Sequence, residues 1–155
     1  MKKFVLLLSI LFLLQLFSCA SPNVGSGKEG EKVSSNKGTV QEISFGKEVD
    51  IKKYVKKGKM TIFDFYSEYC PPCRRIAPLL EKLAEKRDDI VVVKVNINRP
   101  GTYGIDWRSP VARQYNLNSI PHFKIFSKDG KLEMEGRTAY RYILQLLKDE
   151  GLISF

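Results

Sequence analysis

The chain has 155 residues, which is enough for one globular domain and little more. Its 43% content of hydrophobic residues is ordinary for a globular protein that buries a core. The formal net charge of +9 comes from scattered lysines rather than from an arginine-rich stripe interleaved with aromatic residues, so we expect no nucleic-acid partner.

The N-terminus has the pattern of an export signal. Lys2 and Lys3 form a short positive region, and residues 4–16 are nearly all apolar. An apolar segment of this length suits the core of a signal peptide and is short for a membrane span, which needs about 20 residues.

The residues that follow resemble a bacterial lipobox. In Leu16-Phe17-Ser18-Cys19 a leucine stands three positions before the cysteine and a small residue just before it, whereas Phe17 is bulkier than usual. The resemblance implies that residues 1–18 are a lipoprotein signal peptide. It also implies that lipid on Cys19 anchors the exported chain to a bilayer of the bacterial cell envelope, facing the periplasm or the exterior.

Two alternatives to lipidation remain open. Ser18-Cys19-Ala20 also fits the small-x-small site of an ordinary signal peptidase, and the apolar segment could stay as an uncleaved anchor. The chain has 3 cysteines, and either lipidation or removal of Cys19 leaves Cys70 and Cys73 as the only thiols of the mature domain.

A polar segment separates this signal from the rest of the chain. Residues 19–39 are rich in Gly, Ser, Lys and Asn and contain almost nothing to bury. We predict a flexible tether over residues 19–39 that holds a folded domain, residues 40–155, away from the membrane.

The domain alternates strands and helices. The first half predicts a strand over Val40–Phe45, a short helix over Val49–Lys56, a central strand over Met60–Tyr66, a helix over Pro71–Arg87 interrupted by Pro78, and a strand over Ile90–Ile97. The second half predicts a helix starting at Ser109-Pro110, a strand over Phe123–Ser127, a turn at Asp129-Gly130, an edge strand over Leu132–Glu135 and a final helix capped by Thr138. Because strand, helix, strand implies a parallel crossover, the class is α/β with a central mixed sheet flanked by helices on both faces.

Cys70 and Cys73 stand where the central strand meets the following helix. One helical turn brings two cysteines at this spacing within bonding distance, and the free amides of a helix N-terminus favour a thiolate on the first. The second cysteine then acts as the resolving thiol. A purely structural disulfide closes too short a loop to add much stability, and zinc needs more ligands than His122 supplies, so we expect no metal.

Residues 63–78, with Cys70-Pro71-Pro72-Cys73 at their centre, resemble the active-site segment of the thioredoxin family. The similarity extends over about residues 45–150. It implies a thioredoxin-like fold and a thiol–disulfide oxidoreductase whose only redox group is the cysteine pair, without a separate cofactor.

Four further positions match the family. Asp64 corresponds to its buried aspartate, Lys94 to the neighbouring lysine that pairs with it, Pro78 to the helix proline and Ile120-Pro121 to the pair containing a cis proline. Burial would raise the pKa of Asp64 and let it accept a proton from the second cysteine. A cis Pro121 would expose the backbone of Ile120 to an extended substrate.

Each of these positions also has a plainer interpretation. Asp64 could be solvated at a strand end, Lys94 could lie on the surface, and Pro121 could be an ordinary trans proline in a loop. The chain also departs from the family, with Tyr69 in place of a tryptophan and Pro71-Pro72 in place of Gly-Pro.

The departures bear on chemistry and on substrate contact. Neither Pro71 nor Pro72 has an N–H, so Cys70 loses two amide donors, which favours a reducing couple. His122 follows Pro121 where the family has a small polar residue, and it either contacts the substrate or is a half-exposed strand residue. With Tyr69, Pro71, Pro72 and Ile120, it completes the predicted substrate-binding set.

One segment is longer than in a minimal thioredoxin. Residues 99–118 hold the only tryptophan, Trp107, between Lys94 and Pro121. The segment either lies near the active site and helps to select partners, or is a loop packed by its own aromatic residues.

The favoured function is that of a protein-disulfide reductase, supplied with electrons by another membrane protein and acting on disulfides of exported proteins. A disulfide oxidase or isomerase would use the same residues. Two other classes remain: a copper-handling module using Cys70, Cys73 and His122, and a non-catalytic thioredoxin-like interaction domain.

Overall fold

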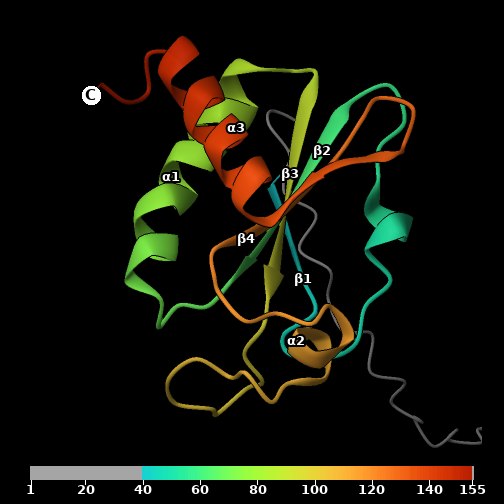
Figure 1. Cartoon of the computed structure of the whole chain (residues 1–155), viewed down its shortest axis with the longest axis vertical. Helices are drawn as coiled ribbons and strands as arrows, with labels where there is room; N and C mark the ends of the chain where they lie inside the picture. The colour runs from blue at the N-terminus through green and yellow to red at the C-terminus, as the bar shows by residue number, and fades with distance from the viewer. Residues whose placement is uncertain (1–39, 155) are drawn as a thin grey trace, which may run out of the picture. The chain divides into compact units, whose positions relative to one another are not determined.

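The computed structural model describes residues 40–154 (Figure 1). The predicted signal peptide, the lipidation site Cys19 and the tether over residues 19–39 lie outside the described residues. No helix within residues 40–154 is long and apolar enough to cross a membrane.

Five strands form a single mixed sheet. They are β1 (Val40–Ile43), β2 (Met60–Tyr66), β3 (Ile90–Asn96), β4 (His122–Phe126) and β5 (Leu132–Glu135), in the spatial order β1-β3-β2-β4-β5. The first three strands are parallel, and β4 and β5 are antiparallel to their neighbours. The predicted α/β class with a mixed sheet is therefore confirmed.

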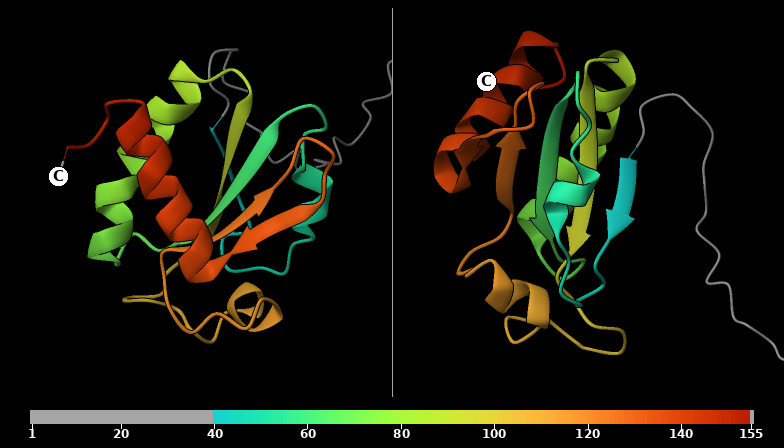
Figure 2. Two further views of the ribbon diagram at one scale, coloured as in Figure 1. Left: turned by 45° about the horizontal axis from the view of Figure 1, so that its top comes forward. Right: turned by 90° about the vertical axis from the view of Figure 1, so that its right-hand side faces the viewer.

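Helices cover both faces of the sheet, as predicted. They are the 3-10 helix η1 (Ile51–Tyr54) and the α-helices α1 (Pro71–Lys86), α2 (Pro110–Gln114) and α3 (Gly136–Asp149). Helices α1 and α3 pack together on one face, where Figure 2 shows them next to each other, and η1 and α2 pack on the other.

Strand β2 explains why the sheet needs cover on both faces. Ile62 packs under α1 and α3, whereas Phe63 and Phe65 point into the cluster beneath η1 and α2, and all three are fully buried. The near-continuous apolar run of the sequence is therefore the mark of a central strand. This strand leads directly into the turn that carries the cysteines.

The first strand and the first helix are shorter than predicted. Ser44, Phe45 and Gly46 all have positive φ, so β1 ends at Ile43. A Cβ atom at Gly46 would lie 2.6 Å from the backbone nitrogen of Arg99, which leaves room for glycine alone. The helix predicted over Val49–Lys56 is only the single 3-10 turn η1.

The prediction that Thr138 caps the final helix is wrong. Helix α3 begins at Gly136, immediately after β5, because the positive φ of this glycine (60°) lets the chain turn at once, and Thr138 lies inside the first turn. The N-cap residue is Glu135, and its side chain makes no cap. Its carboxylate instead accepts a hydrogen bond from Lys124 Nζ (2.6 Å) and lies 3.2 Å from His122 Nε2.

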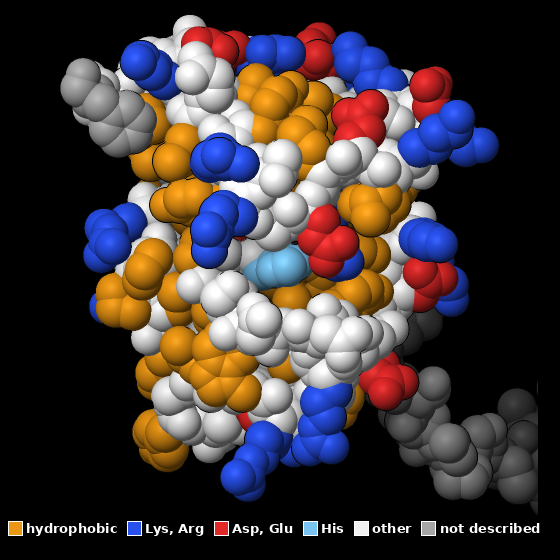
Figure 3. All heavy atoms as spheres, viewed as in Figure 1, with side chains coloured by type: hydrophobic (Ala, Val, Ile, Leu, Met, Phe, Trp, Pro, Cys, Tyr) orange, Lys and Arg blue, Asp and Glu red, His pale blue; other side chains and the backbone are white. Residues whose placement is uncertain are grey.

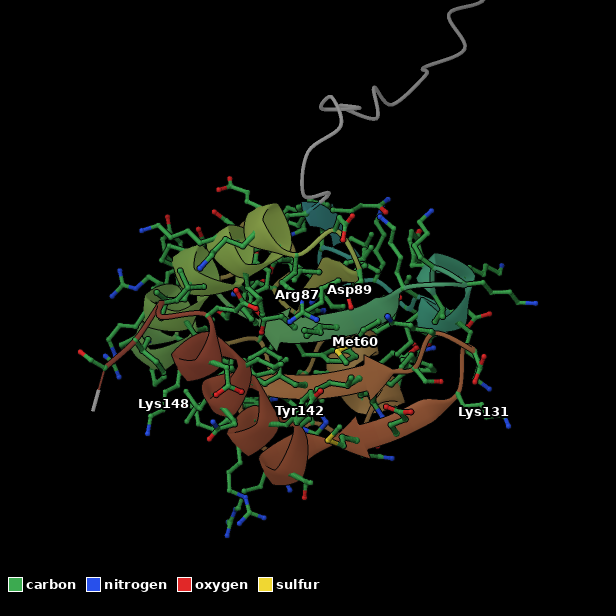
Figure 4. The ribbon with its side chains drawn as sticks, turned by 90° about the horizontal axis from the view of Figure 1, so that it is seen from above. Met60, Arg87, Asp89, Lys131, Tyr142 and Lys148 are labelled. Carbon is green, nitrogen blue, oxygen red and sulfur yellow. A yellow bond between two sulfur atoms is a disulfide. The ribbon has the colours of Figure 1, made fainter. Side chains whose placement is uncertain are left out.

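Ion pairs join the elements at the end of the sheet where β2 and β3 begin. Arg87 donates to both carboxylate oxygens of Asp89 (2.8 and 3.0 Å) and to Glu150 (3.0 Å), and Lys128 also pairs with Asp89 (3.2 Å). Figure 4 labels Arg87 and Asp89 beside each other over β2. The hydrogen bonds from Arg87 are the main cause that lowers the pKa of Asp89 to about 2. These ion pairs connect the end of α1 with the start of β3, the loop after β4 and the end of α3.

Candidate active site

The two cysteines lie just beyond the carboxyl end of β2. A turn over residues 67–70 carries the chain from β2 into α1: the N–H of Cys70 donates to the Ser67 carbonyl and the N–H of Tyr69 to the Ser67 hydroxyl, both at 3.1 Å. Ser67 is fully buried. Ser67 was not among the predicted site residues, although a small polar residue directly after a strand is a typical turn signal.

Cys70 and Cys73 form a disulfide across the first turn of α1, with Cα atoms 5.3 Å apart. Cys70 is the N-cap residue, and the N–H of Cys73 donates to its sulfur at 3.2 Å. Pro71 and Pro72 occupy the first two helical positions and contribute no donor. The N–H of Cys73 is therefore the one amide that donates to the Cys70 sulfur, because Pro71 and Pro72 have no N–H.

The accessible edge of the disulfide belongs to Cys70. Its exposed fraction is 2%, against 0% for Cys73, while Tyr69 beside it is 40% exposed. The peptide bond between Ile120 and Pro121 is cis, and the carbonyl oxygen of Ile120 lies 3.7 Å from Cys70 Sγ. The Cys70 sulfur therefore lies against the backbone of Ile120.

Asp64 lies in β2 with its side chain completely buried. Neither carboxylate oxygen has a hydrogen-bond partner among the described residues. Burial raises the pKa of Asp64 from 3.8 to about 7, although the charge of Lys94 partly opposes this. The carboxyl group can therefore take up or release a proton near neutral pH, and none of its lone pairs is engaged elsewhere.

Lys94 does not form the expected direct pair with Asp64. The two residues are in register on β3 and β2, yet Lys94 Nζ lies 3.5 Å from a carboxylate oxygen of Glu81 on α1 and over the ring of Tyr66, 4.9 Å from its centroid. Glu81 keeps 46% of its side chain exposed, so the ammonium group retains a hydrated partner. A pair with Asp64 would require removing both charges from water, which is costly.

His122 begins β4, directly after Pro121, and is half-buried. Its Nε2 faces the Glu135 carboxylate, and its ring meets the ring of Phe65 edge-on, with centroids 5.9 Å apart. Burial lowers the pKa of His122, and the hydrogen bond and charge of Glu135 partly offset this. The imidazole is therefore held in one orientation at the margin of the disulfide site.

The longer segment 99–118 is held both by polar contacts and by one of its own aromatic residues, Tyr115, whose ring packs against Phe65 with centroids 4.9 Å apart and whose hydroxyl donates to the carbonyl of Val49 (2.6 Å). Arg99 pairs with both oxygens of the buried Asp106 (2.7 and 3.1 Å), and Asn98 donates to the carbonyl of Gly104 (2.6 Å). Tyr103 is 92% exposed and Trp107 is 40% exposed. One aromatic residue of the segment thus packs against the core, whereas the rings of Tyr103 and Trp107 lie at the surface.

No group of three or more His, Cys, Asp or Glu side chains in residues 40–154 is placed to hold a metal ion. The chemistry that this site supports is thiol–disulfide exchange at the Cys70–Cys73 pair.

Comparison with known proteins agrees with this geometry. The family model described as Thioredoxin matches residues 42–149. Thioredoxin-T of Drosophila melanogaster is 36% identical over 86 residues, which are 55% of this chain and 49% of that protein. Chloroplastic thioredoxin F1 of Arabidopsis thaliana is 35% identical over 77 residues, covering 50% of this chain and 39% of its own length. The chain thus spans about half the length of these curated relatives or less.

Solved structures give the same fold. Thioredoxin f from spinach chloroplast, in its short form, superposes with a TM-score of 0.52 at 24% identity and covers 75% of this chain and 96% of that one. This likeness supports the fold alone, whereas the family model covers most of the chain, including the cysteine pair. The chain therefore belongs to the thioredoxin family.

Proposed function

We propose that this protein is a thiol–disulfide oxidoreductase that reduces disulfides of exported proteins. One observation carries the proposal: the Cys70–Cys73 disulfide caps α1, and the Cys70 sulfur lies 3.7 Å from the carbonyl oxygen of Ile120. Family membership supports the same chemistry.

The reaction starts from the reduced protein. The Cys70 thiolate attacks one sulfur of a substrate disulfide, and the substrate S–S bond breaks as a mixed disulfide forms. The departing substrate thiolate takes a proton from water. Cys73 then loses its proton and attacks Cys70 Sγ, which releases the second substrate thiolate and leaves the Cys70–Cys73 disulfide. Two electrons pass from the protein dithiol to the substrate.

Asp64 is the group we assign to take the proton from Cys73. With its pKa at about 7, the carboxylate form is well populated at neutral pH, and neither oxygen is occupied by a partner among the described residues. A base whose pKa lies near the working pH is the most effective at such a transfer.

The reduction potential decides the direction of the reaction. Because Pro71 and Pro72 leave one amide donor on the Cys70 sulfur, the thiolate is weakly stabilised, and we expect a potential near the thioredoxin value of about −270 mV. Equilibration with glutathione or dithiothreitol, read by thiol alkylation, measures it. A value near about −120 mV would make the protein an oxidase or isomerase instead.

The proposed location is the bacterial cell envelope, with lipid on Cys19 as the anchor. This part rests on the sequence of the first 19 residues. Tethering raises the effective concentration of the domain near a membrane protein that supplies electrons. In bacteria given labelled palmitate, the full chain is expected to carry the label and to sediment with membranes, whereas Cys19→Ser loses both. A labelled Cys19→Ser protein would contradict the anchor.

A further inference from the structure

A cavity of about 210 Å³ opens beside Pro121, and the preceding residue, Ile120, contacts Cys70. It is lined by residues from the loop before β4, from the start of β4 and from the first turns of α3: Ser119, Pro121, His122, Gly136, Arg137 and Tyr140. In Figure 3 the single histidine of the chain, in pale blue, reaches the surface with an acidic side chain beside it. The mechanism proposed above makes no use of this cavity.

The position of the cavity ties it to the substrate. Pro121 forms part of its wall, and the preceding Ile120 places its carbonyl oxygen 3.7 Å from Cys70 Sγ. A substrate strand lying along Ile120 and Pro121 would set the side chain of a residue neighbouring its own cysteine at the mouth of the cavity.

The charged side chains around the cavity differ in whether they already have an ion-pair partner. Glu135 is already engaged by Lys124 Nζ at 2.6 Å and by His122 Nε2 at 3.2 Å. Arg137, in contrast, forms no ion pair with any residue in the range 40–154 and is exposed. The cavity therefore offers the guanidinium group of Arg137, whereas the Ser119 hydroxyl already donates to Asn118 Oδ1 (3.4 Å). Pro121 and Tyr140 supply its apolar lining.

We propose that this cavity is a substrate subsite that binds an acidic side chain, glutamate above all, next to the target cysteine. The inference rests on the proposed function and adds to it a preference for substrates with an acidic residue next to the target cysteine. Arg137 pairs with the carboxylate, and the apolar walls pack against the methylene groups that lead to it. His122, oriented by Glu135, shapes the wall on the β4 side.

The test compares substrates as well as variants. The reduced full chain in detergent is mixed with peptides that each carry one disulfide and that have glutamate, glutamine or lysine next to the attacked cysteine. The measured quantity is the second-order rate constant of reduction. We expect glutamate to be preferred over glutamine about fivefold, as for an exposed ion pair at the upper end of its usual range, and lysine to be disfavoured.

Arg137→Gln is expected to abolish the preference, and Arg137→Lys to retain part of it. Arg141→Gln is the matched control, because Arg141 is an exposed arginine one turn further along α3 and does not line the cavity. A wild-type protein that reduces all peptides equally overturns the subsite alone. A preference for glutamate that survives Arg137→Gln also overturns the subsite. So does a preference that Arg141→Gln removes as completely as Arg137→Gln does. A protein that reduces none of the peptides overturns the proposed function and the subsite with it.

Discussion

Asp64→Asn is expected to raise the free energy of unfolding of the oxidised protein at pH 8 by roughly 4 kcal/mol and to leave it nearly unchanged at pH 4. The folded protein raises the pKa of Asp64 from 3.8 to about 7, so it holds this proton more tightly than the unfolded chain. The stabilisation that the proton provides is complete below pH 3.8 and is lost as the pH rises through about 7. Asparagine cannot ionise and avoids that loss.

Urea unfolding at a series of pH values measures this effect. The wild-type free energy of unfolding should fall relative to that of the variant between about pH 4 and pH 7 and stay level above, following the two pKa values. Asp88→Asn is the control, because Asp88 is exposed, and it should leave the pH dependence unchanged. Parallel curves for wild type and Asp64→Asn would show that Asp64 is not buried as a neutral acid.

The same substitution should slow the reaction that the protein carries out. Without a carboxylate to accept the proton of Cys73, resolution of the mixed disulfide at neutral pH is expected to slow by a factor on the order of a hundred or more. Under the proposed mechanism, the buried acid that lowers stability at neutral pH is also the acceptor of the Cys73 proton. This combination is common at functional sites.

Cys73→Ser is expected to stop turnover and to trap the substrate on Cys70. The first attack needs only the Cys70 thiolate, which keeps the N–H of residue 73 as its donor, because serine supplies the same backbone amide. The second attack needs a sulfur at position 73, so the mixed disulfide persists. Intact-mass measurement under non-reducing conditions should find about one substrate chain per protein, and turnover should fall to the uncatalysed background.

Cys70→Ser is the matched control for this experiment. Cys73 has no exposed surface, so this variant should form no adduct under the same conditions. An equal yield of adduct from both variants would show that either sulfur can be attacked, and would contradict the assignment of Cys70 as the nucleophile.

Short-range features of the sequence determined most of the fold and the core of the site. The apolar run of Met60–Tyr66 predicted a central strand because a strand covered on both faces must be apolar on both, and Ile62 and Phe63 do point to opposite sides. The spacing of Cys70 and Cys73 predicted a disulfide across one helical turn. Ser109-Pro110 predicted the start of α2, and the Ser109 hydroxyl accepts a hydrogen bond from the N–H of Ala112.

Only the tertiary structure decided which polar side chains meet. Lys94 stands in register with Asp64, but its ammonium group lies beside Glu81, because a partner on the hydrated side of α1 costs less desolvation than a buried carboxylate does. Thr138 is a residue type that favours an N-cap, but a glycine with positive φ starts α3 at Gly136, three residues before the start that a Thr138 cap would give. These outcomes depend on how distant segments pack, which a local pattern does not encode.

The cavity beside Pro121 is the clearest case. Its walls come from residues 119–122 and from residues 136–140, which are far apart in sequence and meet because β4 pairs with β5 and α3 follows β5 without a break. The sequence by itself determined the alternation of strands and helices and the cysteine pair at a strand–helix junction, because these depend on hydrophobic period and spacing. The thioredoxin-like fold and the cis proline beside the pair were implied by the resemblance to the family. The tertiary structure alone decided where Arg137 stands relative to the disulfide, because that position follows from strand pairing over many residues.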